Sequence, residues 1–163
     1  MKILTLCSML AWLTFGCLNA FANPQGDYKH QIANVLDKLH QRAAQADWKG
    51  YFELYTDEAI FIGTDAAETW TLQEFKQYAR PAFDNGTGWT YKPATRHIYL
   101  GPQHQVAWFD ELLNNDTLGV TRGTGVLIRQ GNTWKIAQYH LAIPVPNALA
   151  DDIAGQIKQF SQP

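Results

Sequence analysis

Arg122-Gly-Thr-Gly-Val-Leu-Ile128 and Trp134-Lys-Ile-Ala-Gln-Tyr-His140 flank the turn pair Gly131-Asn132, and together they predict a β-hairpin. Pro144 follows the second strand and ends it, because proline has no N–H to donate to a neighbouring strand. The hairpin combines glycines with polar side chains near its open end. Glycine inside a strand is typical of places where a ligand or another backbone approaches closely. We therefore expect this hairpin to form the wall of a cavity.

The N-terminus has the pattern of a secretory signal peptide. Lys2 precedes an apolar run over residues 3–15, and Ala20-Phe21-Ala22 is a small-residue cleavage pattern. We expect cleavage after Ala22 and a periplasmic or secreted protein. The apolar run is shorter than the about 20 residues that a membrane-spanning helix needs. Lipid attachment at Cys17 is the alternative, but the residues before it fit a lipidation box badly.

Residues 23–163 then form the mature chain, which we expect to be a single domain. They keep all 15 acidic side chains and all but one of the 13 basic ones, and both cysteines lie in the leader. Without disulfides, stability has to come from an apolar core. Because no basic stripe is present, we expect neither nucleic acid nor an anionic membrane surface as a partner. The scattered histidines predict no metal site, and no cofactor-binding fingerprint occurs.

Hydrophobic periodicity predicts helices first and strands afterwards. Three of the expected helices cover residues 27–46, 47–55 and 147–160. A fourth begins at the capping box Thr71-Leu-Gln-Glu74 and is expected to break near Pro81. The expected strands cover residues 59–62, 89–100, 106–113, 118–129 and 133–143. Short connections between the last four indicate an antiparallel meander. The predicted class is α+β, with the N-terminal helices on one face of a curved sheet.

Counting residues across the predicted turns assigns side chains to the two faces of this sheet. Directly opposed residues share a face. Two-residue turns at Gly131-Asn132 and Asn115-Asp116 place six residues of interest on the face toward the helices, namely Trp108, Asp110, Gly123, Gly125, Gln138 and His140. The other face is mostly apolar and carries Arg122, Glu111 and Tyr139. We expect that face to form a homodimer, with a salt bridge between Arg122 and Glu111 at the interface.

Several segments together resemble the SnoaL-like branch of the nuclear transport factor 2-like superfamily. They are Asp57-Glu-Ala-Ile-Phe-Ile-Gly-Thr-Asp65 with Glu68-Thr-Trp70, Val106-Ala-Trp-Phe-Asp110, Arg122-Gly-Thr-Gly-Val126, the stretch from Trp134 to His140, and Pro144-Val-Pro-Asn147. The resemblance covers residues 27–147. It implies a cone-shaped fold, with helices over the concave face of a curved antiparallel sheet and dimers through the convex face.

The resemblance implies several functions, because this superfamily includes cyclases, ketosteroid isomerases, dehydratases and non-enzymatic modules. The carboxylate base of ketosteroid isomerases would fall at about Ile62 or Gly63, neither of which is acidic. Asp65 would replace it only if its loop turned inward. The sequence therefore argues against steroid-type isomerisation.

Two kinds of side chain are candidates for the cavity. Asp110 and His140 form either an acid/base pair, in which the carboxylate orients the imidazole, or a buried polar pair that satisfies its own hydrogen bonds. Trp70, Trp108 and Trp134 either line an apolar ligand site or belong to the core. Gln138 would orient a polar group of the ligand.

Two functions remain open from the sequence. The first is a dimeric ligand-binding protein that holds a small apolar or aromatic molecule, with binding contributed by Trp70, Trp108, Gln138, Asp65, Gly123 and Gly125. The second is a lyase, isomerase or cyclase that needs no cofactor and uses Asp110 and His140. A domain that only dimerises would need no open cavity.

Overall fold

The computed structural model describes residues 24–160. The predicted signal peptide, residues 1–22, lies outside them. In chain order the elements are α1 (Pro24–Ala44), α2 (Trp48–Phe52), β1 (Tyr55–Ile62), β2 (Thr69–Thr71), α3 (Leu72–Asp84), β3 (Lys92–Leu100), the 3-10 turn η1 (Pro102–His104), β4 (Val106–Asn115), β5 (Gly119–Gln130), β6 (Thr133–Ala142), the 3-10 turn η2 (Asn147–Leu149) and α4 (Ala150–Phe160). This confirms an α+β fold.

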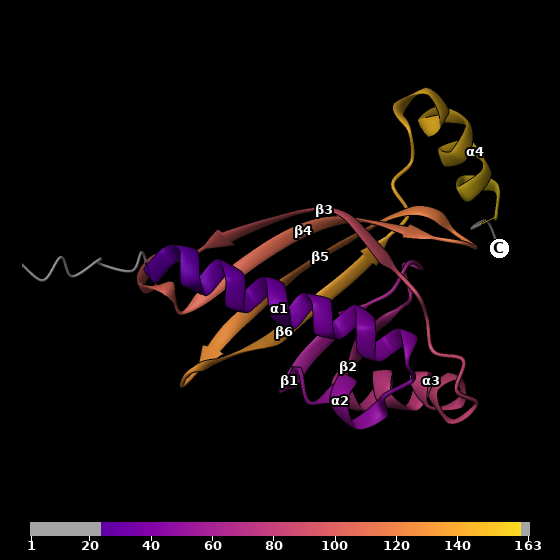
Figure 1. The fold of residues 1–163 in the computed structure, drawn as a ribbon. Coiled ribbons are helices and arrows are strands. Elements are labelled where there is room, and N and C mark those ends of the chain that lie inside the picture. Colours follow the sequence, from indigo (N-terminus) through magenta and orange to yellow (C-terminus); the bar gives the residue numbers. More distant parts are fainter. Residues whose placement is uncertain (1–23, 161–163) are drawn as a thin grey trace, which may run out of the picture.

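The strands form one sheet in the order β2-β1-β6-β5-β4-β3. Strands β3 to β6 are an antiparallel meander, as predicted. Strand β1 pairs in parallel with β6, which no local pattern in the sequence indicated. Helices α1, α2 and α3 pack against one face of this curved sheet, and α4 stands apart from it (Figure 1). We call the face toward α1 to α3 the inner face and the opposite one the outer face.

The helices follow the local signals in the sequence. The apolar stripe of α1 is buried, from Ile32 to Ala43. At the start of α3, Glu74 N donates to Thr71 Oγ1, and Thr71 N donates to Glu74 Oε2 at 2.8 Å, so the capping box is confirmed. The predicted break at Pro81 is wrong, because α3 continues to Asp84. A proline removes one backbone hydrogen bond, and buried Phe83 holds the last turn against the core.

The connection between β4 and β5 is longer than predicted. Asn115 pairs with Gly119 around a three-residue loop, in place of a two-residue turn centred at Asn115-Asp116. The Asn115 Oδ1 atom accepts hydrogen bonds from the backbone N–H groups of Thr117 and Leu118, which fixes the loop. Gly119 has φ of 72°, a conformation that glycine adopts without steric cost.

This loop reverses the predicted faces of β4. Asp110 lies opposite Thr124, three positions away from the predicted partner Thr121. A shift by an odd number of residues moves every side chain of a strand to the other face. Trp108 and Asp110 therefore lie on the outer face, and Glu111 lies on the inner face.

A β-bulge has the same effect on β6. Leu127 pairs with Ile136 as predicted, but Val126 pairs with Gln138, so Ala137 is the extra residue. Beyond the bulge the register differs by one from the predicted register. Gln138 and His140 consequently lie on the outer face, and their predicted position on the inner face is wrong.

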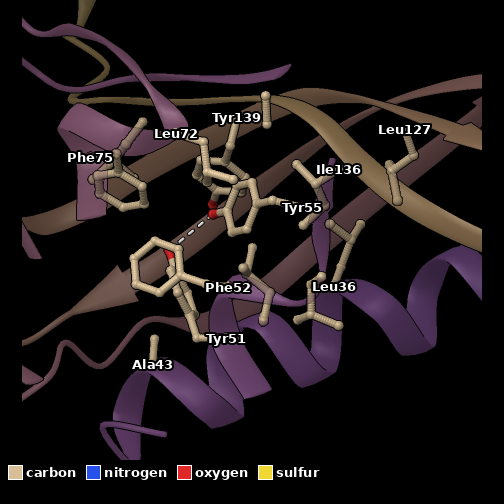
Figure 2. Close-up of a cluster of buried hydrophobic side chains, with 14 of the residues drawn as sticks. Leu36, Ala43, Tyr51, Phe52, Tyr55, Leu72, Phe75, Leu127, Ile136 and Tyr139 are labelled. Atoms are coloured by element: carbon tan, nitrogen blue, oxygen red, sulfur yellow. Dashed lines mark hydrogen bonds between the residues drawn. The ribbon is translucent and has the colours of Figure 1, made fainter. Parts of the chain in front are cut away.

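The core lies between the inner face and helices α1 to α3. Figure 2 shows Leu36 and Ala43 of α1 on one side of the core and Ile136 and Tyr139 of β6 on the other. Aromatic rings from α2 and α3 fill the space between them. Tyr51 and Tyr55 are buried, and their hydroxyl oxygens share a hydrogen bond of 3.0 Å. Burial of this apolar surface is the main stabilising contribution to the domain.

We predict that the Gly125→Ala variant is destabilised by about 1–3 kcal/mol, because a methyl group there overlaps the Gln138 carbonyl oxygen and the Phe109 ring. Gly26→Ala in α1 is the matched control, since a methyl group at Gly26 meets no atom within 4 Å. Urea denaturation measures both. Equal stabilities of the two variants would contradict the observed pairing of Gly125 with Tyr139.

Candidate functional site

A cavity of about 280 Å³ lies between the C-terminal half of α1, helix α3, the loop after β1 and the end of β6. Its walls are mostly aromatic. The Phe61 and Phe75 rings stack with centroids 3.8 Å apart, and Trp70 stacks on Tyr78 at 4.5 Å. The remaining lining residues are Leu39, His40, Ala43, Tyr51, Gly63, Thr64, Glu68, Trp89, Tyr91, Leu118, Tyr139 and Leu141.

A buried polar cluster adjoins this aromatic cavity. Glu111 is fully buried, and its carboxylate has three side-chain partners. His40 Nε2 lies 2.7 Å from Oε1, the Tyr139 hydroxyl donates to the same oxygen at 3.3 Å, and Arg96 Nε donates to Oε2 at 2.7 Å. His40 and Tyr139 also line the cavity. The cluster thus connects the cavity to a charge that water does not reach.

Arg96 compensates the buried carboxylate and extends the cluster to α1. Its Nη1 atom donates to Asp37 Oδ1 at 2.7 Å and to the Ala33 carbonyl oxygen at 3.2 Å. Burial acts to lower the pKa of Arg96, but the neighbouring Glu111 and Asp37 carboxylates outweigh it and raise the pKa. Arg96 is therefore held as a cation between two carboxylates.

Tyr139 reaches Glu111 because β5 has no side chain between them. Gly123 faces Glu111 across the β4–β5 pair, and a methyl group at Gly123 would overlap the Tyr139 hydroxyl. Burial raises the pKa of Tyr139 well above its ordinary value, and the charge of Glu111 adds to this. The space predicted beside Gly123 and Gly125 is filled by the Tyr139 and Phe109 rings. Gly123 and Gly125 do not line the cavity.

The structure places most of the predicted site residues outside the cavity. Asp110 Oδ2 lies 2.8 Å from His97 Nδ1 on the outer face. Thr124 of β5 pairs with Asp110 of β4 on one side and with His140 of β6 on the other, so β5 lies between Asp110 and His140. Two strand spacings amount to about 10 Å, too far for a hydrogen bond. Asp110 and His140 do not form the predicted pair.

The predicted ligand-binding residues divide in the same way. Trp70 lines the cavity, whereas Trp108 is 47% exposed on the outer face, where it stacks on Tyr99. Gln138 lies on the outer face as well. Asp65 does not line the cavity, because its carboxylate accepts a hydrogen bond from the Ala67 backbone within its own loop.

The predictions missed most residues of the cavity and its polar cluster, among them His40, Glu111 and Tyr139. His40 follows Leu36 by four positions on the apolar stripe of α1, and a polar residue at such a position is a signal for a buried polar site. Glu111 alternates with Phe109 and Leu113 in an apolar strand face. Glu111 and Tyr139 were predicted on the outer face at a dimer interface, and this position is wrong because both lie on the inner face. The predicted salt bridge between Arg122 and Glu111 is absent, since Glu111 lies on the inner face and Arg122 is exposed.

A protein-family model described as a SnoaL-like domain matches residues 32–146. The chain belongs to the SnoaL-like domain family. Both the α1 histidine and the β4 glutamate of the buried cluster lie within the matched segment. A search of curated proteins found no match to this SnoaL-like protein.

Solved structures of low sequence identity share the fold of this SnoaL-like domain. An NTF2-like protein of unknown function from Pseudomonas putida KT2440 has a TM-score of 0.64 at 15% identity, covering 75% of this chain and 90% of its own. An NTF2-like family protein from Streptomyces avermitilis, named as a candidate dehydratase, has a TM-score of 0.64 at 13% identity, covering 76% and 100%. A protein from Shewanella frigidimarina NCIMB 400, named as a candidate ketosteroid isomerase, has a TM-score of 0.57 at 17% identity, covering 71% and 97%. These matches confirm the cone-shaped NTF2-like fold.

Among the helices between residues 24 and 160 of the SnoaL-like chain, none combines the length and the apolar character needed to cross a membrane. Within the same residues, no group of three or more His, Cys, Asp or Glu side chains is arranged to hold a metal ion.

We predict that the Glu111→Ala variant is destabilised by about 3–5 kcal/mol, because it removes the buried one of the two carboxylates that hold the Arg96 cation and leaves only the exposed Asp37. The adjacent Asp110→Ala is the control and should cost less than about 1 kcal/mol, since its pair with His97 is exposed. Urea denaturation of both variants at pH 7 measures the difference. A larger loss for Asp110→Ala would mean that the faces of β4 are reversed.

We also predict that stability falls above pH 10. Burial raises the pKa values of Tyr51, Tyr55 and Tyr139 in the folded state, so the folded protein keeps protons that the unfolded chain releases above its tyrosine pKa of about 10. Each tyrosine should lower the free energy of unfolding by about 1.4 kcal/mol per pH unit in this range. Urea unfolding from pH 8 to 11 tests this. The slope should be shallower in Tyr55→Phe, and an unchanged slope would count against the burial of its hydroxyl.

Proposed function

We propose that the protein binds a small, flat, predominantly apolar molecule in the cavity between α1, α3 and β6. The observation that carries this proposal is an open space bordered by stacked aromatic rings, among them Phe61, Phe75 and Trp70. Such rings provide a large contact area at little cost in side-chain entropy. A cavity that served only as core would be filled, since protein interiors are close-packed.

The polar cluster supports a ligand with at least one hydrogen-bonding group. Glu111 holds the Nε2 side of the His40 ring, so the ring has a fixed orientation beside the aromatic walls. A few placed polar groups in a mainly apolar pocket are typical of small-molecule sites. His40 would then fix the orientation of the ligand, the role predicted for Gln138.

Two tryptophans on opposite faces allow a matched test of this proposal. We expect 2-naphthol, a flat probe with one hydroxyl group, to bind in isothermal titration calorimetry. Trp70→Ala should weaken its affinity at least about tenfold, because the loss of a stacked indole removes 1.4 kcal/mol or more. Trp108→Ala on the outer face should leave the affinity unchanged. Absence of binding, or equal losses in both variants, would contradict the proposal.

A second candidate function, proton transfer without a cofactor, is favoured by the pairing of His40 with Glu111. When the ionised carboxylate accepts a hydrogen bond from Nε2, the Nδ1 atom of His40 carries the lone pair and becomes the basic nitrogen. His40 would take a proton from a carbon next to a carbonyl group of the ligand and return it to the resulting enolate. The likeness in fold to a candidate dehydratase and a candidate ketosteroid isomerase agrees with this class of chemistry.

Hydrogen–deuterium exchange separates turnover from binding alone. 1-Indanone is flat and apolar, and it carries exchangeable protons beside its carbonyl group. If His40 acts as a base, the protein should accelerate deuterium incorporation in D₂O, and His40→Ala should lower that rate at least about 100-fold. His140→Ala, on the outer face, should keep the full rate. Exchange that is not accelerated by the protein, or that His140→Ala abolishes, would exclude the His40 mechanism.

Location and assembly belong to the same proposal. The signal-peptide pattern of residues 1–22 supports a periplasmic or secreted protein. Exposed apolar side chains on the outer face, including Val106, Trp108 and Val120, support a homodimer through the sheet.

A further inference from the structure

Helix α4 stands clear of the domain from which it emerges. Figure 1 shows it above the sheet in that view, with α2 and α3 below. None of its residues is buried, and its one extensive contact among the described elements is with η2, which leads directly into it. The helix also follows the segment that matches the SnoaL-like family, which ends at residue 146. The family match therefore says nothing of what α4 packs against.

The sequence of α4 is that of a helix that packs against something. Ile153, Ile157 and Phe160 recur at helical spacing, and Leu149 precedes them on the same side. Phe160 is 92% exposed and Ile157 is 59% exposed. An isolated helix of 11 residues is marginal in water, so most of its stability has to come from an apolar surface that covers this stripe.

The outer face of the sheet provides an apolar surface of the same kind. Tyr99 and Trp108 are exposed there and stack with ring centroids 5.9 Å apart. They lie on β3 and β4, whereas α4 leaves the sheet from β6, which β5 separates from β4. Pro144 and Pro146 stiffen the short segment between β6 and η2. Because Ile157 and Phe160 stay exposed, the sheet of the same chain does not cover the stripe of α4.

The two surfaces offer one complementary pair of charges, at the β6 end of the outer face and away from the Asp110 carboxylate beside Tyr99. Asp151 and Asp152 lie in the first turn of α4. Arg122 on the outer face is exposed and forms no ion pair with any residue that the structure describes. It lies opposite Ala142, at the point where the chain leaves the sheet toward α4. Opposite charges at the rim of an apolar contact favour one orientation of the partners.

We propose that α4 of one copy packs on the outer sheet face of a second copy, with Ile157 and Phe160 against Tyr99 and Trp108. The same contact repeats in the other direction about a two-fold axis. This exchange covers both exposed apolar surfaces, and it places Asp151 and Asp152 near Arg122 of the partner subunit. The proposal is independent of what the cavity binds.

Sedimentation equilibrium measures the assembly. We expect the wild-type protein to be a dimer, and Ile157→Glu to raise the dimer dissociation constant at least about tenfold, since it puts a charge into an apolar contact. Gln159→Glu is the matched control, because Gln159 lies on the opposite side of α4. Its dissociation constant should be close to that of the wild type. A monomeric wild type, or equal behaviour of the two variants, would overturn the proposal.

A dimer of one labelled and one unlabelled chain tests whether α4 packs on the sheet of the partner subunit or on the sheet of its own chain. In a sample of isotope-labelled and unlabelled chains, isotope-filtered NMR should show nuclear Overhauser effects between Ile157 methyl protons of one chain and Trp108 indole protons of the other. Contacts within a single chain would mean that α4 folds back on its own sheet, and a dimer without either contact would mean that α4 takes no part. Both outcomes would overturn the exchange.

Discussion

The buried carboxylate of Glu111 is the constraint on which the inner face of the sheet depends. A charge without water is stabilised only when its partners are close and well oriented. Here His40 of α1, Arg96 of β3 and Tyr139 of β6 all contact one side chain of β4. Because each partner comes from a different element, the ion cluster fixes α1 against three strands. The cavity walls contributed by His40 and Tyr139 are positioned by the same contacts.

Much of the fold could be predicted from local patterns, and the faces of the strands could not. Features that depend only on neighbouring residues were predictable: the apolar stripe of α1, the capping box of α3 and the extents of the last four strands. The faces depend on counting across turns, where one residue reverses the result. The side chain of Asn115 stabilises a three-residue loop, and Ala137 forms a bulge. Neither has a unique signal in the sequence.

These two shifts explain why the inner face carries the predicted types of side chain at other positions in the sequence. A carboxylate and a histidine were predicted on the inner face, with aromatic rings nearby. Glu111 is there in place of Asp110, because β4 is reversed. His40 is there in place of His140, because β6 is reversed beyond its bulge and α1 provides the imidazole. The outer face retains Trp108 and exposed apolar side chains, which suit association better than catalysis.

The central claim is that His40 and Tyr139, and not His140, lie with Glu111 on the inner face. Nuclear Overhauser effects from the histidine ring protons, recorded on the folded protein with labelled histidines, test it most directly. The structure predicts contacts between the His40 and Tyr139 rings, since both bind Oε1 of Glu111. Contacts from His140 to Phe75 or Trp70, with none between His40 and Tyr139, would contradict the account.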